Sequence, residues 1–310
     1  MSENERIKRP VENIIATVVD REDDHDPETV REVLDPITDE GTVIRQATRT
    51  AVSDTSKVVA TAETRVELAR IASEDAIAVA ATVDDLDIVA ARLNAYAERL
   101  EVVEAQVADI TDDLQPPVEQ LADPTAVYEL AVGLRDVATS AQSIVRTADE
   151  LATDLEEFES WLTEPDKRYD EFGEDIDLID ESVTELTAAA AALPTESDAP
   201  AADWAAAKMW TRVLELLIGD LRAELADLQA WADREDAPFR AVLDERVTNL
   251  ERRTGELADT LAELAEPAWC ARFEEHLAAL ERDLKGVEPP VDWEHVQGAL
   301  EEQRKRAFDE

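Results

Sequence analysis

Apolar residues recur at alternating spacings of three and four between residues 86 and 114. This is the heptad pattern of a helix that packs along a partner helix. All positions of the pattern are apolar: Leu86, Val89, Leu93, Tyr96, Leu100, Val103, Val107, Ile110 and Leu114. From Ala47 to Ala80 the spacing changes to three-four-four and the repeated residues are smaller. That period predicts a straighter helix, which a partner can approach closely.

The stretch between Gly41 and Pro116 contains neither Gly nor Pro. Because these two residue types are the strongest helix breakers, we expect one long helix over about 42–115. Pro116 and Pro117 then end this helix and predict a turn.

A second apolar repeat continues from Val127 to Leu193, and Pro165 is its one position that does not fit. We expect a second helix over about 124–193, with Asp123 as its N-cap residue. A proline inside a helix removes one hydrogen bond and bends the axis, which predicts a kink near 165. Because the repeat keeps its frame across the proline, both sides are expected to face the same partner.

Two helices of similar length joined by a short turn predict an antiparallel hairpin. Counting outward from the turn places Leu100 near Ala141 and Val58 near Val183. The alternative is a parallel dimer through residues 86–114, with the second helix folded elsewhere.

The rest of the chain predicts a smaller helical base. Residues 194–203 are polar and bounded by prolines, which indicates a linker. Residues 204–310 form looser leucine repeats divided by prolines, which predict a C-terminal helical bundle. Residues 1–41 contain two short amphipathic segments that we expect to join this base, and no segment shows the sustained alternation of a strand. The predicted fold is therefore all-α: a long antiparallel coiled-coil hairpin arm with a smaller helical bundle.

The charge of the chain is extreme, with 75 Asp and Glu against 30 Lys and Arg and a formal net charge of −45. Self-repulsion of this size destabilises a compact protein at low ionic strength, whereas molar salt shortens the Debye length to about 3 Å. A high acid content with few lysines predicts a protein adapted to a salt-loaded, halophilic cytoplasm. The alternative is an acidic adaptor from an ordinary cell.

The N-terminus lacks the apolar core of a signal peptide, and no stretch is apolar for long enough to span a membrane. We therefore expect a cytoplasmic protein that does not contact a membrane. Nucleic acid is a poor partner, because the net charge has the wrong sign for binding phosphates.

Catalytic motifs for nucleotide binding, serine hydrolysis or zinc proteolysis do not occur in the sequence. Two Glu/Asp–x–x–His units, 22–25 and 292–295, have the spacing of a di-metal ligand pair but lie in a polar run and at a helix start. Cys270 and His276 are six residues apart and do not share a helix face well. We expect a non-enzymatic protein with no catalytic, cofactor-binding or metal-binding residues, and hence no cofactor.

Two groups of residues are candidates for binding a partner protein. The first is a set of tryptophans in the C-terminal region, which are either core residues or an interface: Trp204, Trp210, Trp231, Trp269 and Trp293. The second is a basic cluster near the C-terminus, which either binds an acidic partner or complements a helix dipole: Arg304, Lys305 and Arg306. A smaller basic cluster at the N-terminus has the same two interpretations: Arg6, Lys8 and Arg9.

The Ala-, Thr- and acid-rich stretch from Thr48 to Val83 resembles the cytoplasmic coils of archaeal chemotaxis transducers, as in Ala51-Val52-Ser53-Asp54-Thr55. In this the chain is similar to haloarchaeal soluble coiled-coil proteins of unknown function that are often labelled "halo transducer protein". The resemblance implies a signalling coil, although the Pro116–Pro117 turn does not match the kinase-gripping tip of a transducer. The function we expect is a coiled-coil scaffold or adaptor that binds another protein or self-associates. The alternatives are an SMC-like chromosome-associated accessory protein without an ATPase, and a soluble transducer-like signalling coil.

Overall fold

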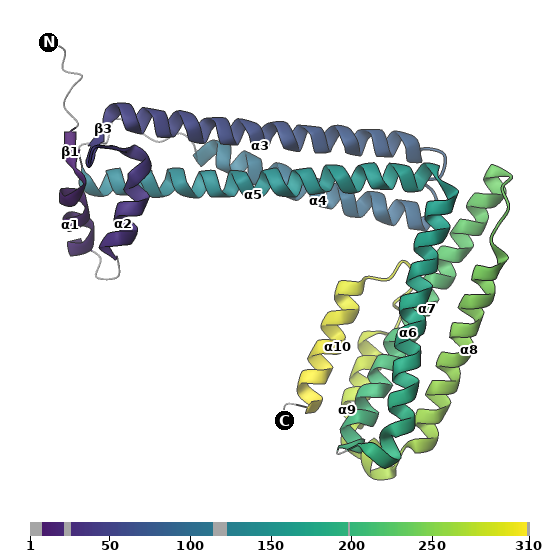
Figure 1. Cartoon of the computed structure of the whole chain (residues 1–310). Helices are drawn as coiled ribbons and strands as arrows, with labels where there is room; N and C mark the ends of the chain where they lie inside the picture. The colour runs from purple at the N-terminus through teal and green to yellow at the C-terminus, as the bar shows by residue number, and fades with distance from the viewer. Residues whose placement is uncertain (1–7, 22–25, 114–122, 198, 309–310) are drawn as a thin grey trace. The chain divides into compact units, whose positions relative to one another are not determined.

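The computed structural model describes residues 8–21, 26–113, 123–197 and 199–308. The chain is almost entirely helical, which confirms the all-α class (Figure 1). It forms two compact units. Unit 1 comprises Met1–Val79 and Leu93–Glu159, and unit 2 comprises Ala80–Arg92 and Ser160–Glu310.

Unit 1 begins with a small module of helices and strands. The two short helices expected within residues 1–41 are α1 (Val11–Arg21) and α2 (Pro27–Leu34), and they lie in unit 1 rather than with the C-terminal helices that they were expected to join. The expectation of no strand is wrong, because β1 (Lys8–Pro10), β2 (Thr38–Asp39) and β3 (Thr42–Ile44) form an antiparallel sheet in the order β1-β3-β2. Strands of two or three residues are too short to show a period-two pattern.

The turn between β2 and β3 has positive φ at both of its central residues, Glu40 (46°) and Gly41 (75°). This left-handed geometry matches the twist of a two-residue hairpin. Gly41 adopts it without steric cost, whereas Glu40 does so against the preference of its side chain. A 3₁₀ helix, η2 (Asp35–Ile37), joins α2 to β2.

The single helix expected over 42–115 is divided into α3 (Arg45–Ala80) and α4 (Asp87–Asp113). The break contains no Gly or Pro, but Thr82, Val83 and two aspartates have low helix propensity. Asp227 of α7 also accepts a hydrogen bond from the Ile88 backbone N–H at 2.9 Å and so caps the start of α4. The change of apolar period near residue 80 coincides with this break.

The body of unit 1 is therefore built from α3, α4 and α5 (Pro124–Thr163), and the two-helix hairpin arm is not confirmed. Their shared core is made of small and β-branched residues: Val59, Ala62, Val66, Val103, Ile110, Val137, Ala141, Ile144 and Ala148. Thr111 of α4 donates to Glu63 of α3 at 3.2 Å, and Arg99 of α4 contacts Asp154 of α5 at 2.8 Å. Tyr96 of α4 also packs against Phe158 of α5, so residue numbers fall along α5 as they rise along α4 and these two helices are antiparallel. Figure 1 shows α4 antiparallel to α3 as well.

The pairing expected between the two long helices is wrong in register and in extent. The contact between Arg99 and Asp154 is displaced by about three helical turns from the pairing of Leu100 with Ala141. Val58 packs against the core of unit 1, whereas Val183 is buried in unit 2. The expected hairpin paired α3 with residues that follow Pro165. In the structure, α3 packs against α4 and α5 instead.

The break expected near Pro165 is confirmed, because α5 ends at Thr163 and α6 (Pro165–Glu196) begins after an extended Glu164. The expectation that both sides face the same partner is wrong. The α5 positions from Val137 to Ala148 pack in the core of unit 1, and the α6 positions pack against α7 and α8 in unit 2. Each of the two helices has an apolar face of its own. A repeat that keeps its frame across the proline therefore does not require a shared partner.

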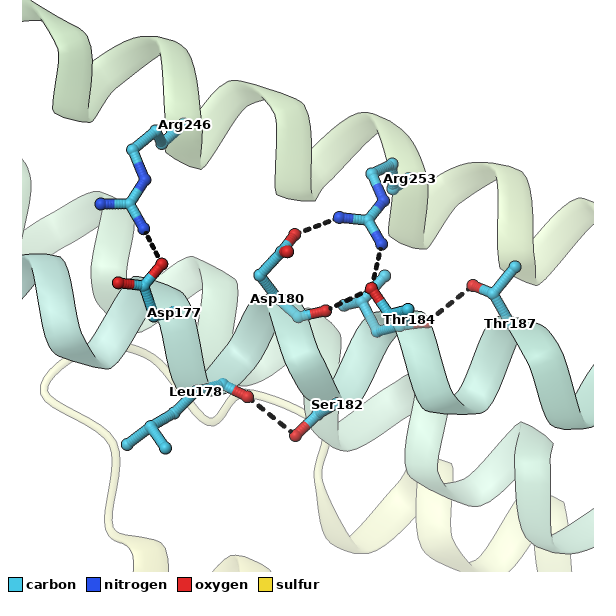
Figure 2. A network of polar contacts seen from close by, with 9 residues as sticks. Asp177, Leu178, Asp180, Ser182, Thr184, Thr187, Arg246 and Arg253 are labelled. Carbon is cyan, nitrogen blue, oxygen red and sulfur yellow. Dashed lines mark hydrogen bonds and ion pairs between the residues drawn. The ribbon is translucent and has the colours of Figure 1, made fainter.

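Unit 2 is built on three long helices, α6, α7 (Pro200–Glu235) and α8 (Ala241–Leu264). Arginines near and on α8 pair with aspartates of α6 along the edge of this core: Arg240 with Asp166 and Asp170, Arg246 with Asp177, and Arg253 with Asp180. Figure 2 shows Arg246 and Arg253 reaching from α8 to α6, with Thr184 donating to the backbone of α6 and accepting from Arg253 at 2.7 Å. Because residue numbers rise together on both sides, α6 and α8 run parallel.

The C-terminal helices complete unit 2. α9 (Pro267–Asp283) and α10 (Trp293–Phe308) pack on each other and on α7. Phe273 of α9 and Met209 of α7 are both fully buried in their common core. The segment after α9 passes through Pro289 and Pro290 before α10 begins, and Val291 in this segment is buried.

Candidate functional site

The strongest candidate site is a cleft that lies within unit 2 and has a volume of about 370 Å³. Three segments far apart in the sequence line it: the start of α4, the middle of α7 and the segment before α10. Its walls are largely apolar, from Ile88, Ala91, Ala223, Pro289, Pro290, Val291 and Trp293. Its polar groups are four carboxylates and one guanidinium: Asp87, Asp220, Glu224, Asp227 and Arg92. We refer to it below as the α7 cleft.

Three acids of α7 stand one turn apart along the cleft, at Asp220, Glu224 and Asp227. The two outer acids hold the walls in place. Asp220 accepts hydrogen bonds from the Val291 backbone N–H and from Trp293 Nε1, both at 3.2 Å. Asp227 accepts from the Ile88 backbone N–H. Each outer carboxylate therefore ties one distant segment to α7.

Glu224, between them, has no hydrogen-bond or ion-pair partner among the described residues. Its side chain is half-buried. Burial raises the pKa of the Glu224 carboxyl to about 7, with further raising contributions from Asp175, Glu171 and Asp220 and an opposing one from Arg92. Burial also raises the pKa of the neighbouring Asp175 carboxyl. Near neutral pH, a half-buried carboxyl of this kind either holds a proton or carries a negative charge that neighbouring cations do not balance.

Arg92 is the one cation lining the α7 cleft, and it is engaged elsewhere. Its NH2 donates to Glu171 Oε1 at 2.6 Å, and its guanidinium lies 4.2 Å from the ring centre of Trp161. Trp161 in turn packs edge-on against Trp231, with their ring centres 5.4 Å apart. These contacts fix the start of α4 within unit 2 through cation–π and aromatic packing.

Arg168 closes the same cluster from the other side. It is buried, and its guanidinium lies 3.8 Å from the ring centre of Trp231. Its NH1 donates to the carbonyl of Leu162 at 2.7 Å, and its NH2 donates to Glu235 at 3.0 Å. Pro165 has no N–H to offer the last turn of α5, so Arg168 supplies donors to carbonyls that the break leaves without helical partners.

The structure does not gather the five candidate tryptophans into one patch. Trp204 and Trp231 are buried, Trp269 and Trp293 are half-buried, and Trp210 is 40% exposed. Trp204 Nε1 donates to the carbonyl of Leu261 at 2.7 Å, as a core tryptophan does. Trp293 alone among them lines the α7 cleft.

The candidate basic cluster lies in the last turn of α10, where Arg304, Lys305 and Arg306 are all exposed. Arg306 pairs with Glu302 at 2.5 Å, and Arg304 lies 5.7 Å from the ring centre of Trp210. Cations at this position complement the helix dipole. In the N-terminal cluster, Lys8 and Arg9 belong to β1, and Arg6 lies outside the described residues.

The weaker chemical candidates lie apart from one another. Cys270 is exposed near the start of α9, and His276 is half-buried six residues further along. Asp292 accepts from the His295 backbone N–H at 3.1 Å and so acts as an N-cap. Residues 22–25 lie outside the described residues. Within the described part of the chain, no group of three or more His, Cys, Asp or Glu side chains could hold a metal ion.

The sequence alone does not distinguish Glu224 or its two neighbours, because one acid among 75 carries little information. A weak signal exists, since each of the three acids directly precedes a core leucine of α7: Leu221, Leu225 and Leu228. Positions next to a core position are half-buried in packed helices, and acidic residues are more common at exposed positions.

No protein-family model, curated protein or solved structure matches the chain. Among the helices that the structure describes, none combines the length and the hydropathy needed to cross a bilayer. The interpretation of the chain's function therefore depends on its own geometry.

Proposed function

We propose that the chain is a non-enzymatic helical scaffold or adaptor of a halophilic cytoplasm, and that unit 1 binds a helix of another protein. The observation that supports this is a stripe of exposed apolar residues on α3. Leu68 is 46% exposed, Ile71 42% and Val79 39%. Together with Asp75, they occupy positions spaced by three, four and four on one face of the helix, which is the pattern of a second helix-packing surface.

The stripe is separate from the face that α3 buries inside unit 1. The buried residues of this part of α3 are small, at Ala69, Ser73 and Ala76. Large apolar side chains on the outer face and small ones on the inner face are the reverse of what a solvated helix requires. Exposed apolar patches of this kind mark protein–protein contact sites in water-soluble proteins.

The charge around the stripe selects the kind of partner. Asp75 lies within it, and Glu67 and Glu74 flank it on either side of Arg70, which pairs with both. A second copy of the chain would bring the same acids together, whereas an amphipathic helix with flanking Arg or Lys would offset them. We therefore favour a basic amphipathic helix of a different protein as the occupant.

The test is a recovery experiment in molar KCl with the full chain and a photo-crosslinker placed next to the stripe. Leu68→Ser with Ile71→Ser should lose a partner that the unmodified chain retains, because both side chains are exposed and the fold does not depend on them. Val242→Ser on α8, where the valine is 57% exposed, is the matched control and should retain it. The crosslinked peptide should be an amphipathic helix rich in Arg or Lys.

Three outcomes would contradict the proposal. Equal recovery by the stripe variant and the control would show that the stripe is not the docking surface. Crosslinks only between copies of this chain, with a dimeric mass by light scattering, would support self-association instead. Recovery that nuclease abolishes would favour the chromosome-associated alternative.

A further inference from the structure

The α7 cleft has three properties that are independent of the proposed function. It is a concave site with largely apolar walls, it is lined by five charged groups, and its walls are positioned by hydrogen bonds that its outer acids accept. Asp220 and Asp227 are both used in positioning the walls. Glu224 faces the same space and positions nothing among the described residues.

We propose that the α7 cleft binds a small organic cation, an ammonium or guanidinium group on a short apolar body, and that Glu224 receives its charge. A binding pocket of this class is mostly apolar with a few placed polar groups. The cleft has this composition, with Trp293, Val291 and Ile88 available to contact the apolar body.

The charge balance of the cleft favours a cation over an anion or a neutral ligand. Four carboxylates line it against one guanidinium, and that guanidinium, Arg92, already pairs with Glu171. A ligand cation next to Glu224 gains attraction from Asp87, Asp220 and Asp227 as well. An anion would meet the same groups as repulsion.

The size of the cleft limits the ligand. A volume of about 370 Å³ lies at the lower end of the range for small-molecule sites. A single aromatic or branched aliphatic group with one charged end fits this space, whereas a folded protein domain does not. A bare metal ion is a poor match, because the described residues offer no cluster of ligands for one.

The binding test uses phenethylammonium as the probe and phenethyl alcohol as its neutral isostere. Both are titrated into the full chain at pH 8 in buffered KCl, with detection by calorimetry or ligand-observed NMR. Phenethylammonium should bind at least about tenfold more tightly than the alcohol, because only the cation pairs with a desolvated carboxylate.

Two variants test the role of Glu224 and the role of the space. Glu224→Gln should weaken phenethylammonium about tenfold or more and leave the alcohol unchanged. Ala223→Leu fills the cleft without altering the carboxylate and should weaken both probes. Glu185→Gln, an exposed Glu-to-Gln change on α6, is the matched control and should alter neither.

The affinity for the cation should also depend on pH, since it requires an ionised Glu224. The groups around Glu224 are Arg92 and Asp87 from α4, Glu171 and Asp175 from α6, and Asp220 and Asp227 from α7. Below the pKa of Glu224 the cation must displace a proton, so its affinity should fall as the pH is lowered from 8 to 6. Equal binding of the ammonium and the alcohol, or full binding by Glu224→Gln, would overturn the proposal.

Discussion

The half-buried carboxyl of Glu224 predicts a pH-dependent stability that a single substitution should remove. Its pKa moves from 4.5 in the unfolded chain to about 7 in the folded protein. A raised carboxyl pKa means that the folded state binds the proton more tightly, so stability is highest when the group is protonated. The contribution is present below pH 4.5 and is lost progressively as the pH rises to about 7.

The size of the effect follows from the two pKa values. Each pH unit between them is worth about 1.4 kcal/mol, so the free energy of unfolding should fall by about 2.5 kcal/mol between pH 5 and pH 8. Solvent that enters the α7 cleft reduces this figure, and we expect a fall of about 1–2.5 kcal/mol.

Glu224→Gln isolates this contribution from the many other acids that titrate in the same range. Gln keeps the shape of the side chain and carries no charge, so the variant should be more stable than the unmodified chain by about 1–3 kcal/mol at pH 8. At pH 5 most of that difference should disappear. Urea unfolding followed by circular dichroism, at fixed molar KCl and several pH values, measures it.

The pH dependence of the difference in unfolding free energy between variant and unmodified chain distinguishes Glu224 from a surface acid. Glu185→Gln on the exposed face of α6 should differ from the unmodified chain by a small amount that does not change with pH. If the difference between Glu224→Gln and the unmodified chain is also flat from pH 5 to pH 8, Glu224 is solvated like a surface acid. The α7 cleft would then hold no desolvated carboxylate to pair with a cation.

Two further predictions concern charge elsewhere in the chain. Arg168→Met should destabilise unit 2 by about 3–5 kcal/mol in urea unfolding, because Glu235 and the carbonyl of Leu162 lose a buried partner. The control is Arg252→Met, which removes an exposed pair with Glu256 and should cost about 0.5 kcal/mol or less. Lowering KCl from the molar range to about 0.1 M lengthens the Debye length from about 3 to about 10 Å and should melt the helices of a chain with net charge −45, so unchanged helical circular dichroism would contradict the halophilic assignment.

The parts of the fold that the sequence predicted correctly are those with a strong local cause. Helix faces follow from apolar spacing, and the break before α6 follows from the missing N–H of Pro165. The start of α5 follows from Asp123, the expected N-cap residue, whose Oδ1 accepts from the Thr125 backbone N–H at 3.2 Å. Each of these causes acts within a few residues and is therefore visible in one sequence.

The break between α3 and α4 could not be predicted in the same way, because its cause lies elsewhere in the chain. Residues 82–85 have weak helix propensity, but the segment contains no breaker and a continuous helix would have been acceptable on local grounds. What makes the break favourable is tertiary: Asp227 caps Ile88, and Arg234 pairs with Asp85 at 2.6 Å. Both partners are more than a hundred residues away.

The same long-range contacts explain why the break and the α7 cleft belong together. Without the break, Ile88 would have a helical partner for its backbone N–H and would not need Asp227. The start of α4 would then lose one of the contacts that hold it beside α7, in addition to those of Arg92 and Asp85. The outer acids of α7 thus help to bring together residues 87–92, 220–227 and 289–293, which line the cleft. Glu224 lies between these two acids and is therefore half-buried. Its neighbours in the sequence do not distinguish it from the other acids of the chain.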